Sequence, residues 1–227
     1  MTLDEYKARA KADLDNAFEK GKSQGSDAQI ILDRMRILDG QWQQAAFPEG
    51  FNFVMEFKNK PNTLNALLML ATGVKTATLI CKAEGTIVYN QMVRSSTVEV
   101  LDLTNFKPTP TQINWFALGA SKLVSVFGEI DMTNCTSTTG AFNTTTALEE
   151  IRFKEGTIGI SIQLNNCNNL TAESLHSILM GLSPTVTGQT LTLPIYEICK
   201  ATYDAKYGEG AWDILAASKT NWTIAYS

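Results

Sequence analysis

The amino-acid sequence predicts an α/β solenoid, with a parallel β-sheet along one face, a helical appendage at the N-terminus and a helical cap at the C-terminus. One observation is a recurrence of short β-type segments, with inward positions at Leu79, Leu103, Met132, Leu164, Leu193 and Ile224. These positions lie roughly 30 residues apart, and such a recurrence is typical of stacked repeats. Another observation is a repeated hexapeptide, IDMTNC at 130–135 and IQLNNC at 162–167, with a related LDLTNF at 101–106.

Residues 1–45 are predicted to form a helical stalk or docking segment. An apolar stripe runs through residues 3–20, a break rich in glycine and small polar residues follows at 21–27, and a second helical stretch carries Ile31 and Leu38. An amphipathic cap lying on the main domain is an equally good interpretation. We expect a homo-oligomer through these helices, but its order is open, because a strict heptad over 3–20 would place Lys7 in the seam.

The hexapeptide gives each of its residues an expected role. In a leucine-rich repeat, two apolar side chains point inward from a short strand, and the asparagine after it bonds backbone groups of the adjacent turn. Cysteine is among the most often buried residues and suits a column inside successive coils. The repeat residues are Leu101, Leu103, Asn105, Ile130, Met132, Asn134, Cys135, Ile162, Leu164, Asn166 and Cys167.

Residues 50–227 are therefore predicted to form one leucine-rich-repeat solenoid with a parallel β-sheet face, capped from about residue 170. Apolar and polar residues alternate in most of its β-type segments, so each strand would bury one side. In the cap, LTAESLHSILMGL predicts a helix with Thr171 as N-cap, and residues 194–219 predict two helices broken at Gly208 and Gly210. These helices would end the solenoid and cover its exposed backbone groups.

Composition and charge exclude several classes of function. The chain has 227 residues, of which 44% are hydrophobic, and its 19 basic and 23 acidic residues give no positive field that would gather nucleic acid. Eighteen consecutive apolar residues occur nowhere, so no membrane span is expected, and the charged N-terminus does not resemble a secretory leader. We therefore expect cytoplasmic synthesis and free thiols at Cys81, Cys135, Cys167 and Cys199.

No catalytic, cofactor-binding or metal-binding residue is predicted. His176 is the only histidine, and no Cys or His stands at ligand spacing from it, so an ordinary zinc site cannot form. A nucleophile elbow is absent, and GEGAWD (208–213) lacks the third glycine and the lysine of a phosphate-binding loop. The sequence predicts a protein that is not an enzyme.

The remaining candidate is a binding surface on the outer side of the predicted sheet. Stacked strands would arrange outward side chains in rows, which suits a mildly acidic surface for protein or glycan binding. A role in keeping the sheet soluble explains the same residues equally well. These candidate residues are Glu99, Asp102, Glu129, Asp131, Ser161 and Gln163.

Two segments also carry a resemblance to a known family. AFNTTTALEEIRFKEGTI (141–158) resembles the repeat unit of BspA-like leucine-rich repeat proteins, and TIVYNQMVRSSTVEVLDL (86–103) resembles a degenerate copy. The C-terminal stretch, from NNCNNLTAESLHSILMGL through GQTLTL to KTNWTIAYS, is similar to the C-terminal end of short leaderless members found in gut Firmicutes and their prophages. The resemblance covers roughly residues 75–227.

The resemblance implies a structural, tail-associated component of a phage or prophage particle. Its partners would be other virion proteins or a bacterial surface protein or glycan, and it would lie in the virion after cytoplasmic synthesis. The alternative is an adhesin on the bacterial cell surface. A hydrolase with an unrecognised site ranks below both.

Overall fold

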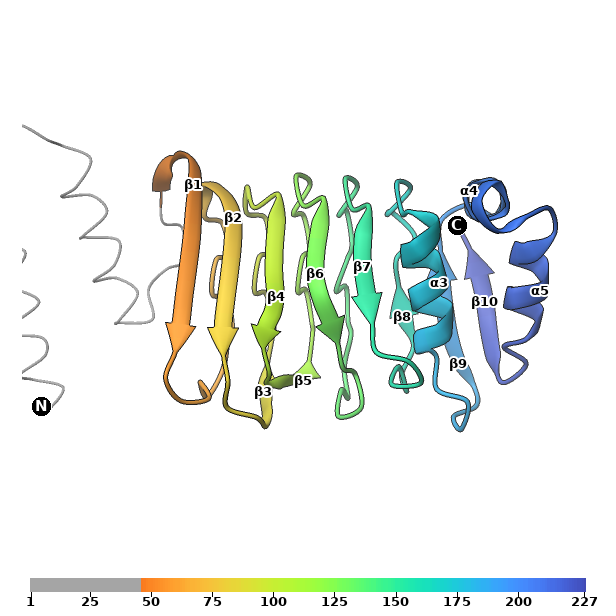
Figure 1. Ribbon diagram of the computed structural model, residues 1–227, viewed down its shortest axis with the longest axis horizontal. Helices are drawn as coiled ribbons and strands as arrows, with labels where there is room; N and C mark the ends of the chain where they lie inside the picture. Colours follow the sequence, from red (N-terminus) through yellow and green to blue (C-terminus); the bar gives the residue numbers. More distant parts are fainter. Residues whose placement is uncertain (1–45) are drawn as a thin grey trace, which may run out of the picture.

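The computed structural model describes residues 46–227, which form a parallel β-solenoid of about 4 turns followed by a region with three helices (Figure 1). The stalk or docking segment predicted for residues 1–45 lies outside the described residues. Within residues 46–227, no helix combines the length and apolar character needed to cross a membrane.

One side of the solenoid is a five-stranded parallel sheet with the order β1-β2-β4-β6-β7. Its strands are β1 (Ala46–Phe57), β2 (Thr72–Cys81), β4 (Val100–Phe106), β6 (Ser125–Ile130) and β7 (Glu150–Phe153). Thr76 pairs with Val100, Val100 with Ser125, and Ser125 with Glu150. The longer steps predicted from Leu103 to Met132 and from Met132 to Leu164 are therefore wrong for this sheet.

Shorter strands form two further, separate sheets. They are β3 (Thr86–Val88) and β5 (Thr109–Gln112), which pair with each other, and β8 (Ile162–Gln163), β9 (Gln189–Leu193) and β10 (Trp222–Tyr226), which form a three-stranded parallel sheet in the order β10-β9-β8. Because β6 belongs to the five-stranded sheet and β8 to the three-stranded sheet, the hexapeptides at 130–135 and 162–167 do not stack on each other. The single column predicted through Leu103, Met132 and Leu164 is therefore wrong.

LDLTNF and IDMTNC share a local aspartate turn, although they occupy different places in the coil. The Oδ1 atom of Asp102 accepts the backbone N–H of Thr104 at 2.9 Å, and the Oδ1 atom of Asp131 accepts that of Thr133 at 3.0 Å. Aspartate commonly bonds backbone two residues further on and so stabilises a turn. In LDLTNF this turn interrupts β4, whereas in IDMTNC it follows the end of β6.

Sharp corners recur on the side opposite the five-stranded sheet. Each corner is bonded to the next one along the solenoid, as in the bond from the N–H of Gln91 to the carbonyl of Asn114 at 2.9 Å. Two columns of residues have a left-handed backbone there, with one member from each successive coil: Ala66, Gln91, Trp115 and Gly140 in one, and Leu70, Ser95, Gly119 and Thr144 in the other.

The core between the two sides is apolar and contains a chain of aromatic contacts. The ring of Tyr89 contacts those of Phe106 and Phe116, with centroids 6.1 and 6.4 Å apart, and Phe116 contacts Phe142 at 5.7 Å. The hydroxyl of Tyr89 donates to the carbonyl of Pro108, which pairs the only polar atom of its buried side chain.

The C-terminal region ends the five-stranded sheet with a helix. α3 (Ala172–Gly181) lies beside β7, where a sixth strand would otherwise pair (Figure 1). The hydroxyl of Ser174 accepts the N–H of Ile151 and donates to the carbonyl of Glu149. Likewise, the hydroxyl of Ser177 accepts the N–H of Phe153 and donates to the carbonyl of the same residue. These serines replace the backbone partners that a strand would supply.

Two further helices complete this region. α4 (Tyr196–Tyr207) and α5 (Ala211–Ala217) meet at the break predicted at Gly208 and Gly210. The carboxylate of Asp204 accepts the N–H groups of Trp212 at 2.8 Å and of Gly210 at 3.0 Å. The predicted N-cap is also confirmed, since the side chain of Thr171 accepts the N–H of Ser174.

Candidate functional site

The six residues of the predicted binding surface lie on two different sides of the solenoid. Asp102 and Glu129 stand on the outer side of the five-stranded sheet, each next to a buried residue of its strand. Glu99 precedes β4 and forms an ion pair with Lys75 at 3.9 Å. Asp131 follows β6, whereas Ser161 and Gln163 lie at β8 on the opposite side.

The outer side of the five-stranded sheet presents one row in continuous register. Val54 pairs with Thr78, Thr78 with Asp102, and Asp102 with Phe127. Val54 is 65% exposed and Phe127 is 43% exposed. The row therefore offers apolar side chains at its two ends and polar side chains between them.

Beyond this row, β4 and β6 are no longer paired with each other. Pairing between β4 and β6 ends at Asp102 and Phe127, while β4 stays paired with β2 to Phe106 and β6 with β7 to Ile130. At this point the N–H of Thr104 bonds the side chain of Asp102, and Gly128 of β6 packs closely against the backbone of Leu103 and Thr104.

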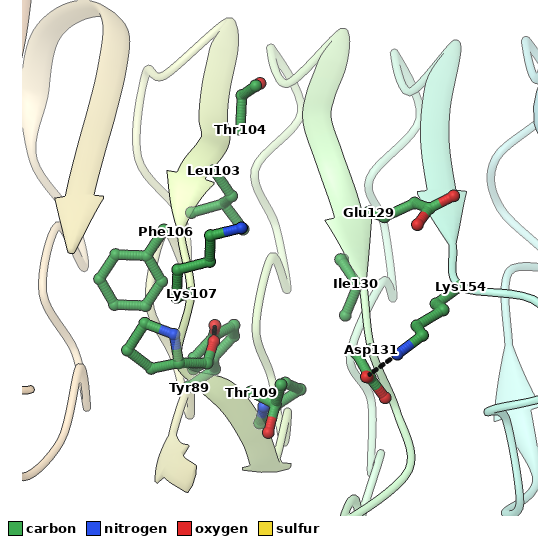
Figure 2. Close-up of a pocket in the computed structure, with 12 residues that line it drawn as sticks. Tyr89, Leu103, Thr104, Phe106, Lys107, Thr109, Glu129, Ile130, Asp131 and Lys154 are labelled. Atoms are coloured by element: carbon green, nitrogen blue, oxygen red, sulfur yellow. Dashed lines mark hydrogen bonds and ion pairs between the residues drawn. The ribbon is translucent and has the colours of Figure 1, made fainter. Parts of the chain in front are cut away.

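A pocket of about 280 Å³ lies in this division (Figure 2). Figure 2 shows Lys107 on the β4 side and Glu129, Asp131 and Lys154 on the side of β6 and β7. The pocket is also lined by the apolar residues Leu103, Phe106, Pro108, Pro110 and Ile130.

One ion pair dominates the electrostatics of this pocket. The Nζ atom of Lys154 lies 2.8 Å from Oδ2 of Asp131, and the hydroxyl of Thr133 donates to Oδ1 at 2.6 Å. Partial burial opposes ionisation, but the bonds from Lys154 and Thr133 hold the pKa of Asp131 below its usual value. Among the described residues, Lys107 forms no ion pair, whereas the charge of Glu129 helps to raise the pKa of Lys154.

A second pocket, of about 350 Å³, lies on the same side beside α3 and contains His176. The Nδ1 atom of His176 is 2.7 Å from the hydroxyl of Tyr203, and the two rings are nearly parallel. Arg152, Glu173 and Tyr207 also line this pocket. No group of three potential ligands among residues 46–227 is placed to hold a metal ion.

All four cysteines are free and buried. Burial raises the pKa of Cys167 and of Cys199 to about 12 and also raises the pKa of Cys135. These three thiols are therefore protonated at neutral pH and have the packing role of small apolar residues. Cys135 and Cys167 do not form the predicted column, because their segments occupy different positions in the coil.

The structural asparagines are different from those predicted. Asn105 and Asn134 are exposed, Asn166 is half-buried, and none of the three side chains makes a hydrogen bond within the described part of the chain. Asn90 and Asn114 have the expected role instead. Oδ1 of Asn90 accepts the N–H of Asn114, and Oδ1 of Asn114 accepts the N–H of Thr139, both at 2.9 Å. These bonds span 24 and 25 residues, which is the step of one coil.

A third pocket, of about 380 Å³, contains the two predicted residues that are not on the five-stranded side, Ser161 and Gln163. It lies between the corner at Thr139 and the start of β9 at Gln189. Comparison of the chain with protein-family models, curated proteins and solved structures gave no match.

Proposed function

We propose that this protein is a non-enzymatic binding scaffold that docks a protein partner on the outer side of its five-stranded sheet. The observation that supports this most is the row from Val54 to Phe127, which a parallel ladder holds in fixed register. An exposed aromatic side chain surrounded by polar groups is a common anchor of protein interfaces. The charge of Lys107, which forms no ion pair within the described residues, would give such a contact its orientation.

The chemistry of the side chains supports a role other than catalysis. His176 is bonded to a phenol hydroxyl, and the pKa values of three buried thiols are raised. A catalytic cysteine has the opposite property, a lowered pKa in an accessible place.

We further propose that the solenoid is a leucine-rich repeat of the BspA-like type and that the protein is a tail-associated component of a phage or prophage particle. The resemblance of residues 141–158 and of the C-terminal stretch supports this assignment. The docked partner would then be a neighbouring virion protein. Oligomerisation through residues 1–45 stays a prediction of the sequence.

Mass spectrometry of purified particles, from a host in which variants replace the native gene, tests this proposal. We expect wild-type peptides in particles and about tenfold fewer with Phe127→Glu, because a carboxylate cannot be buried unpaired at the contact. The matched control is Lys122→Glu, which adds the same side chain at an exposed corner and should be incorporated normally.

Two results would contradict the proposal. Equal incorporation of the Phe127→Glu variant would show that the row is not the docking surface. Absence from particles, together with peptides released by protease from intact uninfected cells, would favour the bacterial adhesin.

A further inference from the structure

The pocket at Ser161, Gln163 and Gln189 differs from the two other pockets described above because its lining carries no charged side chain. Hydroxyl and amide groups line it, together with Gly140 and one isoleucine. Its volume of about 380 Å³ falls within the range of small-molecule sites, roughly 300 to 1,000 Å³. A carboxylate or phosphate would find no cation there to pair with.

A hydrogen-bond network fixes the amide of Gln189 in one orientation. Its Oε1 atom accepts the N–H of Ser161 at 2.8 Å and the hydroxyl of Ser161 at 2.9 Å. That hydroxyl in turn accepts the N–H of Thr190 at 2.9 Å. Since the oxygen is committed to these donors, the two N–H groups of Nε2 are left for another acceptor.

Two more polar groups of the pocket are unbonded within residues 46–227. The side chains of Gln163 and Thr139 are exposed and make no hydrogen bond there. Together with Gln189 they offer donors and acceptors without net charge. This combination matches the hydroxyl groups of a neutral sugar, which both donate and accept.

An exposed tryptophan stands at the border of the pocket. Trp115 is 40% exposed, and its Cδ1 atom lies 2.9 Å from the position that a Cβ on Gly140 would take. The indole thus rests against the backbone of a glycine that lines the pocket. An aromatic ring beside polar groups suits the apolar C–H face of a sugar ring.

The backbone of Trp115 is strained, with a φ of 52°. A left-handed conformation is unfavourable for a bulky residue, and Gln91 and Gly140 occupy the equivalent corners of the neighbouring coils. Packing alone does not call for an exposed indole at this corner, because Gln91 and Gly140 hold the same place in the neighbouring coils without one.

We propose that this pocket, with Trp115 at its border, is a binding site for a neutral carbohydrate. The indole contacts one face of the sugar ring, and Gln163, Gln189 and Thr139 bond its hydroxyl groups. The site lies on the side of the solenoid away from the row at Phe127, so it does not depend on the function proposed for the five-stranded sheet.

Saturation-transfer NMR on the full-length protein tests the site with cellobiose, maltose, lactose and N,N′-diacetylchitobiose as probes, and with sialyllactose as a charged counterpart. We expect at least one neutral probe to bind with a Kd below about 10 mM and sialyllactose to bind no tighter than lactose. Trp115→Gly should weaken that binding at least about tenfold. Its fold should persist, because glycine relieves the left-handed strain.

A second variant and a matched control distinguish a loss of sugar binding from a loss of the fold. Gln163→Ala removes an exposed side chain with no bond inside the described chain, and it too should weaken binding at least about tenfold. Phe127→Ala removes an exposed aromatic ring from the opposite side and should leave binding unchanged. Failure of every neutral probe to bind at about 10 mM would overturn the proposal. So would binding that survives either Trp115→Gly or Gln163→Ala.

Discussion

The residues at the corners of the solenoid adopt a backbone conformation that most side chains avoid. Glycine occupies only two of the eight left-handed corner positions, at Gly119 and Gly140. The left-handed conformation costs roughly 1 to 2 kcal/mol at a residue with a side chain. The backbone bonds between adjacent corners, such as that from Trp115 N–H to the Thr139 carbonyl at 2.8 Å, hold the chain there in spite of this cost.

Replacing Thr144 with glycine should therefore stabilise the protein. Thr144 has a φ of 58° and carries a β-branched side chain, which is especially unfavourable in this conformation. We expect the free energy of unfolding to rise by about 0.5 to 1 kcal/mol, since the relief of strain exceeds the greater chain entropy of glycine. Urea denaturation measures the change.

Thr146→Gly is the matched control, because Thr146 is also exposed but is not left-handed. There glycine should lower the stability by about 0.5 to 1 kcal/mol. Equal effects of the two substitutions would mean that strain at Thr144 contributes nothing.

For single residues, the sequence predicted which side chains are buried better than it predicted which side chains form hydrogen bonds. Leu101, Ile130, Met132, Cys135 and Cys167 are all buried, as their alternation with polar residues indicated. The hydrogen-bonding roles predicted for Asn105, Asn134 and Asn166 were wrong because each hexapeptide forms only a local turn. A turn depends on residues close together in the sequence. Such local chemistry cannot tell which position of a coil a segment occupies.

Among the secondary-structure elements, α3 has the most consequential position. Its serines Ser174 and Ser177 supply both donors and acceptors to β7, although a helix cannot continue a sheet. Ser174 is 2% exposed, so water cannot substitute for its hydroxyl. The edge of β7 is thereby closed to other strands.

Ser174→Ala should destabilise the protein by about 1 to 3 kcal/mol, because it leaves the buried N–H of Ile151 without this partner. The melting temperature should fall accordingly, and hydrogen exchange at Ile151 should accelerate more than exchange at Val126, in the middle of the sheet. Ser121→Ala, at an exposed position, provides the comparison and should change stability by less than about 0.5 kcal/mol. Unchanged exchange at Ile151 would contradict this role for Ser174.

The helix itself was predictable from Thr171 and its apolar stripe. Its bonds to β7 were not, because they depend on a coil step of 23 or 24 residues between the paired groups, as between Ile151 and Ser174. The repeated hexapeptide indicates a longer step, the interval from Cys135 to Cys167. That interval separates two turns that occupy different positions in the coil.

For the whole molecule, a parallel solenoid with a helical C-terminal region was predictable, and its period was not. Irregular pairing, such as the shift between Ser125 and Glu129 in β6, alters the apparent spacing of apolar residues. The insertion of α3 lengthens the step from β8 to β9, and the insertion of α4 and α5 lengthens the step from β9 to β10. The intervals predicted between inward-facing residues therefore combined these longer steps with the regular steps of the five-stranded sheet.

A repeat of about 25 residues implies that one coil can be removed intact. Deletion of residues 99–123 would bring Val124 to the place of Glu99, in agreement with the register of Val100 and Ser125. We expect a shorter protein that still unfolds cooperatively, with a lower melting temperature and a smaller urea m-value, since coils contact mainly their neighbours. Circular dichroism during urea titration measures both quantities.

Deletion of residues 164–188 shortens the chain equally but takes away α3 and exposes the edge of β7. This variant should aggregate at concentrations where the first stays monodisperse in light scattering. Similar behaviour of the two deletions would show that coils are not interchangeable units.

The direction of the backbone bonds also determines how the protein would respond to a mechanical load. β1 and β10 lie at opposite ends of the stack, and the bonds between strands run along the line that joins those ends (Figure 1). Tension between the ends would therefore break the hydrogen bonds between one pair of adjacent strands at a time. Each released coil would add roughly 80 Å of extended chain. Because coils contact mainly their neighbours, the stack would lengthen gradually under tension.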